Sequence, residues 1–174
     1  MTGVGAGAGG GAGCGGPVPP VTVLVDGRSG AGKTTLSGRI RGAVVVHLDD
    51  LYPGWAGLAA AGDIVAEHVL DPVAPGYRRW DWSAGRPGEW VALDPGADLV
   101  VEGCGAVTGA TLTAARRRSG DRVLTVDVTG PEGLRRRRAL DRDPGFAAFW
   151  DLWALQELWH RRTMPEPDLR LTCR

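Results

Sequence analysis

One octapeptide constrains this chain more than any other segment. Residues 27–34 read GRSGAGKT and match the pattern G-x-x-x-x-G-K-[ST] at every fixed position. An apolar run at 21–25 precedes the octapeptide and a helix-compatible segment at 35–40 follows it, which is the context that the pattern requires. Lys33 is the only lysine of the chain, and it occupies the fixed lysine position. The sequence therefore predicts a phosphate-binding loop (P-loop) near the start of an α/β domain.

The chemistry of such a loop explains its residue types. Glycines let the backbone curl so that successive N–H groups converge on one anion, and the following helix adds the positive end of its dipole. The ammonium of Lys33 is a compact charge that can follow the β- and γ-phosphates, whereas a guanidinium prefers a fork geometry. The hydroxyl of Thr34 is placed to ligate Mg²⁺. We expect nucleotide binding by Gly27, Arg28, Ser29, Gly30, Ala31, Gly32, Lys33, Thr34 and Thr35.

Size and charge narrow the class of protein. We expect a flexible tail rich in Gly, Ala and Pro over 1–19 and one domain over 20–174. A formal net charge of zero argues against a nucleic-acid surface, and no apolar run approaches the roughly 20 residues that span a bilayer. The three cysteines lack metal-ligand spacing and the first residues do not resemble a signal peptide. These features predict a reduced, cytoplasmic protein without a membrane or nucleic-acid partner.

Apolar runs alternate with helical segments along the chain. We expect strands at 21–25, 44–48, 99–101, 122–128 and 169–171. We expect helices at 35–40, 56–70, 107–118, 131–141 and 146–162, and an irregular insertion at 71–97. Continuous apolar strands between helices indicate a parallel sheet covered on both faces. The predicted fold is α/β: a three-layer P-loop NTPase fold with a central parallel sheet of about five strands, helices on both faces and a small lid at about 135–146.

Carboxylates follow two of the predicted strands. Asp49 and Asp50 come after the strand at 44–48, and Glu102 comes after the strand at 99–101. Ligands bind beyond the carboxyl ends of parallel strands, so we expect these side chains near the P-loop. Glu102 is a candidate for positioning the metal, and Asp49 for accepting a proton from an acceptor hydroxyl. Which of the two contacts Mg²⁺ directly stays open.

Three segments carry a resemblance to the uridine kinase and phosphoribulokinase group of P-loop kinases. Residues 49–52 (DDLY) resemble the D-x-[F/L]-[Y/H] signature of that group, and residues 100–103 (VVEG) resemble its apolar strand ending in Glu-Gly. Residues 134–143 (LRRRRALDRD) are similar to its arginine-rich lid helix. The resemblance implies that Asp49 is the catalytic base and that ATP and Mg²⁺ are used. We assign Tyr52, the last residue of the signature, to the acceptor site.

Arginines of the lid segment are candidates for contacting the transferring phosphate. On a helix, Arg135, Arg138 and Arg142 share one face, and a lid arginine can stabilise the charge of the transferring group. We expect Arg138 and Arg142 to reach phosphate, with a solvated basic face as the alternative. For residues 116–118 (RRR), we expect a solvated helix C-terminus.

The tryptophans fall into two groups. One group, which we expect in the core, combines Trp150 and Trp153 with the helically spaced Phe146, Phe149 and Leu152. The other group, in or near the insertion, is Trp55, Trp80, Trp82 and Trp90.

Residues 77–82 (YRRWDW) combine flat rings, guanidinium donors and a carboxylate. This mixture suits a nucleoside-like acceptor, or else a loop pinned by its aromatic residues. We assign Tyr77, Arg79, Trp80 and Asp81 to the acceptor site. The three histidines, His47, His68 and His160, follow no partner pattern and receive no role.

Three functional hypotheses follow from these features. The leading one is an ATP- and Mg²⁺-dependent phosphotransferase acting on a hydroxyl (or phosphate) of a small polar acceptor, above all a nucleoside or nucleotide-like molecule. The alternative is a nucleotide-dependent switch or regulatory ATPase, but not the usual GTPase, because a chain without asparagine lacks the N-K-x-D motif. A kinase fold that only binds ligand is disfavoured by the joint presence of the P-loop, Asp49 and Glu102. The acceptor and the oligomeric state stay open.

Overall fold

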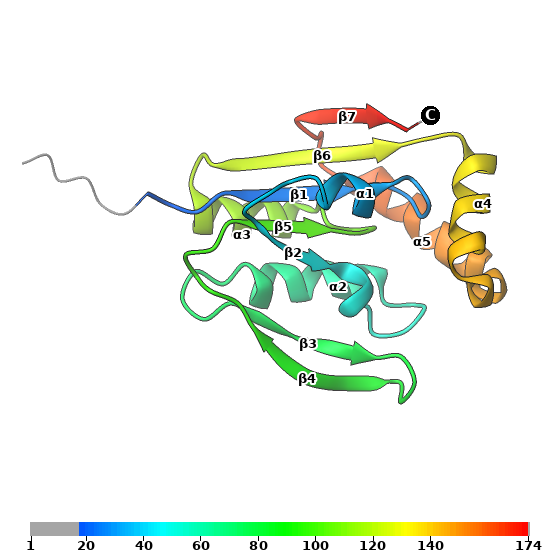
Figure 1. The fold of residues 1–174 in the computed structure, drawn as a ribbon, viewed down its shortest axis with the longest axis horizontal. Coiled ribbons are helices and arrows are strands. Elements are labelled where there is room, and N and C mark those ends of the chain that lie inside the picture. Colours follow the sequence, from blue (N-terminus) through cyan, green and yellow to red (C-terminus); the bar gives the residue numbers. More distant parts are fainter. Residues whose placement is uncertain (1–17, 174) are drawn as a thin grey trace, which may run out of the picture.

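A parallel sheet of five strands forms the centre of the molecule (Figure 1). The computed structural model describes residues 18–173, so nearly all of the tail expected over 1–19 lies outside the described residues. The strand order is β2-β5-β1-β6-β7 and every pairing is parallel. The strands are β1 (Thr22–Asp26), β2 (Val44–His47), β5 (Leu99–Glu102), β6 (Val123–Thr129) and β7 (Leu169–Thr172).

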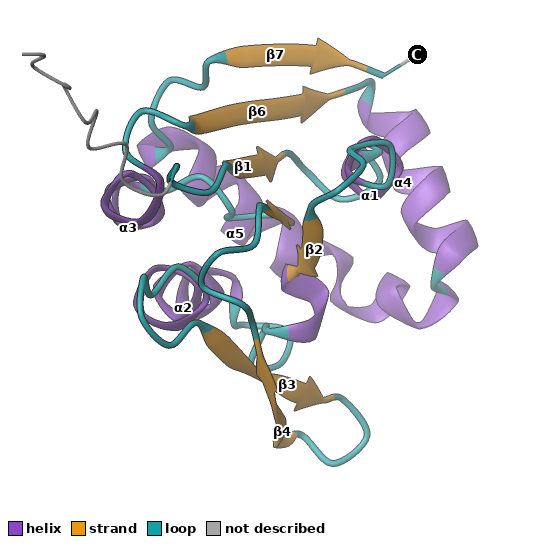
Figure 2. Ribbon diagram, turned by 60° about the vertical axis from the view of Figure 1, so that its left-hand side comes forward, coloured by secondary structure: helices purple, strands orange, loops and turns teal. Residues whose placement is uncertain are grey.

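Helices cover both faces of this sheet (Figure 2). They are α1 (Lys33–Ser37), α2 (Leu58–Ile64), α3 (Gly109–Ser119), α4 (Glu132–Arg142) and α5 (Trp150–Thr163). Along β1, Leu24 faces a core shared with α2, α3 and α5, whereas Val23 and Val25 face a smaller core that includes Leu36 of α1. This alternation follows from the two-residue period of a strand. The predicted three-layer α/β fold is confirmed.

The segment at 71–97 is more regular than we predicted. It forms an antiparallel hairpin of β3 (Gly76–Asp81) and β4 (Arg86–Ala92), which lies outside the main sheet (Figure 1). The prediction of an irregular insertion is wrong because the hairpin has no clean alternation of buried and exposed residues. β4 has no buried residue, and a register shift between Arg78 and Trp80 interrupts the pairing.

The helices also differ from the predicted ones in detail. The helix expected at 56–70 is α2 followed by a π-helical turn, Val65–Val69, and the helix expected at 146–162 is a 3₁₀ segment, Pro144–Phe149, followed by α5. The helix expected at 35–40 begins earlier, at Lys33, and ends at Ser37 before Gly38. None of the described helices is long and apolar enough to cross a membrane.

The exposure of two side chains is the opposite of what we predicted. Leu152, expected in the core, is 46% exposed, because Trp153 and the other buried residues of α5 lie on a different side of the helix. Arg118, expected in solvent, is buried, since its guanidinium donates hydrogen bonds to the carbonyl oxygens of Pro95 and Ala97 at 3.1 and 2.5 Å. Those bonds compensate for the burial of its charge.

Candidate functional site

The P-loop connects β1 to α1 and depends on glycine for its shape. Gly27, Gly30 and Gly32 have φ angles of 141°, 74° and 99°, which residues with a Cβ rarely adopt. A Cβ atom on Gly30 would also clash with the carbonyl oxygen of Arg135 in α4, and one on Gly27 with that of Val128 in β6. The loop is therefore fixed by its neighbours as well as by its own sequence.

Lys33 begins α1 and is buried at the centre of the loop. Its Nζ donates to the carbonyl oxygen of Arg28 at 3.2 Å and contacts the Sγ of Cys104 at 3.5 Å. Burial acts to lower the pKa of Lys33, but the nearby carboxylates of Glu102, Asp26 and Glu157 act in the opposite direction and the pKa is raised. Burial also raises the pKa of Cys104 from 9.0 to about 12, so Lys33 is a cation beside a neutral thiol at pH 7.

The last residues of β2 and β5 lie beside α1. The hydroxyl of Thr34 donates to Oε1 of Glu102 at 2.8 Å, and Nδ1 of His47 lies 2.6 Å from the same oxygen. His47 and Glu102 are register partners across the two strands, which explains their proximity. A hydroxyl and a carboxylate next to the phosphate loop are the hard oxygen ligands that Mg²⁺ prefers. These residues therefore fit a magnesium ion.

A cavity of about 580 Å³ opens above the P-loop. Its lining combines four parts of the chain: the P-loop end, the segment after β2 with Trp82 of the hairpin, the end of β5, and the predicted lid with α5. The lining residues are Ser29, Gly30, Gly32, Lys33, Thr34, Thr35, Asp49, Tyr52, Trp55, Trp82, Glu102, Cys104, Arg138, Ala139, Arg142, Asp143, Phe146 and Trp153. Of the predicted nucleotide-binding residues, Gly27, Arg28 and Ala31 do not line it. The cavity size suits small-molecule ligands.

Asp49 faces this cavity from the 3₁₀ turn Leu48–Asp50 that follows β2. Its side chain is 68% exposed, and Oδ2 lies 3.9 Å from a guanidinium nitrogen of Arg142. The indole of Trp82 donates to the backbone oxygen of Asp49 at 3.0 Å, which links the hairpin tip to this turn. An exposed carboxylate held at a cavity wall can accept a proton from a bound hydroxyl.

Aromatic rings form the wall of the cavity next to Asp49. Trp55 stacks on Phe149 and Phe146 with centroid distances of 4.5 and 5.3 Å and interplanar angles of 8° and 11°. Trp82 lies 5.0 Å from Trp55, and Trp153 closes the group from α5. Flat apolar faces beside a carboxylate and a guanidinium can hold a ring-bearing polar molecule.

The lid arginines divide into two roles. Arg138 and Arg142, which we expect to contact phosphate, line the cavity. The buried Arg135 instead donates to the carbonyl oxygens of Gly130 and Ser29 at 3.1 and 3.2 Å, so it ties α4 to the P-loop. Arg138 also donates to the Sγ of Cys173 at 3.2 Å, beyond β7.

The structure does not bring most of the predicted acceptor residues to the cavity lining. Tyr77 is buried in the hairpin base, and Arg79 lies 3.5 Å from both Asp50 and Glu89. Asp81 accepts three hydrogen bonds from the turn that follows it, and Trp80 does not line the cavity.

One further predicted acceptor residue and one unassigned residue do reach the cavity. Tyr52 lines it and donates to the carbonyl oxygen of Cys104 at 2.9 Å. Trp82, which we did not assign to the site, is the hairpin residue in the lining.

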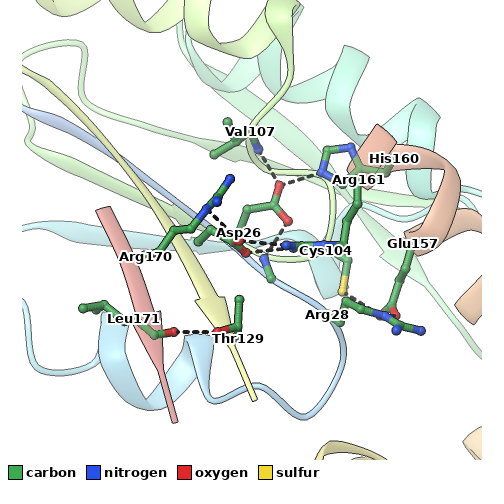
Figure 3. Close-up of polar contacts among 12 residues, drawn as sticks. Asp26, Arg28, Cys104, Val107, Thr129, Glu157, His160, Arg161, Arg170 and Leu171 are labelled. Carbon is green, nitrogen blue, oxygen red and sulfur yellow. Dashed lines mark hydrogen bonds and ion pairs between the residues drawn. The ribbon is translucent and has the colours of Figure 1, made fainter. Parts of the chain in front are cut away.

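A buried polar network beneath the P-loop was not predicted. Figure 3 shows Asp26, the last residue of β1, between the loop and α5. Asp26 accepts hydrogen bonds from the amides of Gly27 and Val107 at 2.6 and 2.7 Å and lies 2.9 Å from Nε2 of His160. Burial acts to raise the pKa of Asp26, but His160 and these amides outweigh burial and lower it.

Glu157, one turn before His160 in α5, holds the loop itself (Figure 3). Its carboxylate accepts from the amide of Ser29 at 2.6 Å and from Nε of Arg28 at 2.7 Å, while the thiol of Cys104 donates at 3.4 Å. Burial acts to raise the pKa of Glu157, but the bonds from Ser29 and Arg28 outweigh burial and lower it. The P-loop thus sits on a carboxylate supplied by α5.

No local pattern in the sequence predicts this network. Glu157 and His160 are polar residues among the apolar residues of this segment, and their partners Ser29 and Asp26 are more than 120 residues away. Arg161 extends the same side of α5 by a two-pronged hydrogen bond to Asp127 of β6, both distances being 2.9 Å. Only the docking of α5 onto the sheet brings these groups together.

Comparisons with known proteins agree with this fold. No protein-family model and no curated protein matches the sequence. A candidate fructose transport system kinase from Silicibacter sp. TM1040 matches with a TM-score of 0.52 and 15% identity over 87% of this chain and 89% of that chain. A candidate uridine kinase from Bacillus stearothermophilus matches with 0.50 and 14% over 88% and 89%. At such identities the likeness concerns the fold: this chain has the fold of P-loop kinases.

Proposed function

We propose that this protein is an ATP-dependent phosphotransferase that moves the γ-phosphate to a hydroxyl of a small acceptor. One observation carries the proposal: a single cavity joins the P-loop end at Lys33 to an exposed carboxylate, Asp49. Phosphoryl transfer requires mainly positioning and charge neutralisation, together with a group that accepts the proton of the attacking hydroxyl. A nucleotide-binding switch would not need an acid–base group and an aromatic wall in the same cavity.

Each part of the cavity has a role in this reaction. The P-loop amides and Lys33 hold the phosphates of ATP, and Arg138 and Arg142 of α4 neutralise charge that develops on the transferring group. Asp49 takes the proton from the acceptor hydroxyl as the new P–O bond forms, and ADP leaves. Thr34 and Glu102 would hold Mg²⁺, which, when bound, offsets the negative charge of the β- and γ-phosphates.

The acceptor is proposed to be a nucleoside or a similar ring-bearing molecule. The rings of Trp55, Trp82 and Phe146, which line the cavity, support this choice, because they give it an apolar aromatic wall near Asp49. In this proposal Trp82 contacts the acceptor, in place of its neighbours Trp80 and Asp81, to which we had assigned that contact. Cytoplasmic location remains a prediction from composition.

Replacing Asp49 with Asn tests the assigned base. With an acceptor that supports turnover, kcat should fall about 10²–10⁴-fold because the proton loses its acceptor, while ATP affinity stays within about twofold. Asp50→Asn is the matched control, since Asp50 is adjacent but does not line the cavity. Full turnover by Asp49→Asn, or collapse in Asp50→Asn alone, would remove Asp49 from this role.

A further inference from the structure

The outward side of α5 is apolar although it faces solvent. Trp159 is 68% exposed and Leu155 64%, and Leu158 and Leu152 are 50% and 46% exposed. At 3.6 residues per turn, these four side chains fall on one side of the helix. We call Leu152, Leu155, Leu158 and Trp159 the α5 face. An exposed cluster of large apolar side chains on one helix indicates an interaction site rather than ordinary surface.

An acidic residue lies at one end of the α5 face and a basic residue lies at the other end. Asp151 lies in the first turn of α5 and Arg162 in the last, and both are exposed. They are eleven residues apart, three turns or about 16 Å along the axis, so they project from the same side of the helix. Within the described part of the chain, neither of them forms an ion pair.

We propose that the α5 face binds the α5 face of a second copy of this chain, with the two helices antiparallel. A two-fold axis between Gln156 and Glu157 places Asp151 of each copy opposite Arg162 of the other. The same axis places Leu155 opposite Leu158, at the centre of the contact. One surface then supplies both sides of the interface, as two-fold dimers require.

The charge pattern selects this occupant over others. An acidic residue at one end and a basic residue at the other complement each other only when two such helices run in opposite directions; parallel helices would bring like charges together. A lipid surface would favour basic residues along the border of the apolar face, whereas Asp151 stands on it. The buried side of α5 braces the P-loop through Glu157 and His160, so the dimer leaves that contact intact.

Sedimentation or light scattering of the full chain tests the interface. We expect a species of twice the 18.3 kDa chain mass at micromolar concentrations. Leu155→Arg should give a folded monomer, because a charge would be buried without a partner at the centre of the contact. Val73→Arg, at an 80%-exposed position outside α5, is the matched control and should stay dimeric.

Charge reversal then tests the antiparallel register. Asp151→Arg and Arg162→Asp should each raise the dimer dissociation constant about tenfold or more, since each creates like-charge contacts. Mixing the two variants should yield a heterodimer of near wild-type affinity, because both positions again pair opposite charges, one pair with reversed sign and the other as in the wild type. A wild-type chain that stays monomeric up to about 100 μM, or a dimer that Leu155→Arg leaves intact, would overturn the proposal. Equal weakening in the mixture would overturn the antiparallel pairing.

Discussion

Gly30 shows how a single position joins the P-loop to the rest of the fold. Its φ of 74° and its contact with the carbonyl oxygen of Arg135 leave no room for a Cβ. We predict that Gly30→Ala lowers the free energy of unfolding by at least about 2 kcal/mol, or the melting temperature by about 4–8 °C. Differential scanning calorimetry measures this change.

Gly133, inside α4, is the matched control for that substitution. A Cβ at Gly133 meets nothing within 4 Å, and the residue has no positive φ. Gly133→Ala should therefore raise stability by about 0.4–1 kcal/mol through the lower entropy of the unfolded chain. If both substitutions had the same small effect, the described packing of α4 against the loop would be incorrect.

Helix α5 is the element that supports the P-loop, and Glu157 is its main contact. We predict that Glu157→Gln costs about 1–3 kcal/mol at pH 7, because Ser29 and Arg28 lose a charged acceptor. The control Glu166→Gln, at a 79%-exposed ion pair with Arg170, should change stability by less than about 0.5 kcal/mol. Urea titrations of the three proteins give these values.

The same contact predicts a pH dependence. The pKa of Glu157 is lower in the folded chain than the ordinary glutamate value of 4.5, so the folded state binds the proton less tightly than the unfolded state. Its stabilisation is complete above about pH 5 and is lost as pH falls through the folded pKa. The stability difference between wild type and Glu157→Gln should therefore shrink on acidification. A difference that stays constant from pH 7 to pH 3 would contradict the assignment.

Among the tryptophans of the β3–β4 hairpin, only Trp82 lines the cavity. Because the ring of Trp82 contacts Trp55 and its indole donates to the backbone oxygen of Asp49, Trp82→Ala should lower kcat/KM for the acceptor about tenfold, or about 1.4 kcal/mol. The KM for ATP should change little. Trp90→Ala, on β4 and outside the lining, should leave both constants near wild type. Equal losses in the two variants would indicate a general effect of the hairpin.

At the scale of the whole molecule, some parts of the site follow from local sequence patterns, and others form only when distant elements pack together. The P-loop, the strand-end carboxylates and the lid helix could be predicted, because each depends on a short motif next to a strand. The contact of His47 with Glu102 and that of His160 with Asp26 could not, since the partners are 55 and 134 residues apart. The hairpin escaped prediction because its exposed strands do not alternate in burial.

The central claim is that the cavity transfers phosphate from ATP to a small acceptor. The most direct measurement is ADP production from Mg·ATP across nucleosides, nucleoside monophosphates, pantothenate-like alcohols and sugars, with Lys33→Ala as the blank. We predict stimulation by one class, above all nucleosides, at least about tenfold over the acceptor-free rate and absent in Lys33→Ala. Lys33-dependent hydrolysis that no acceptor stimulates would contradict it and favour a nucleotide-dependent switch.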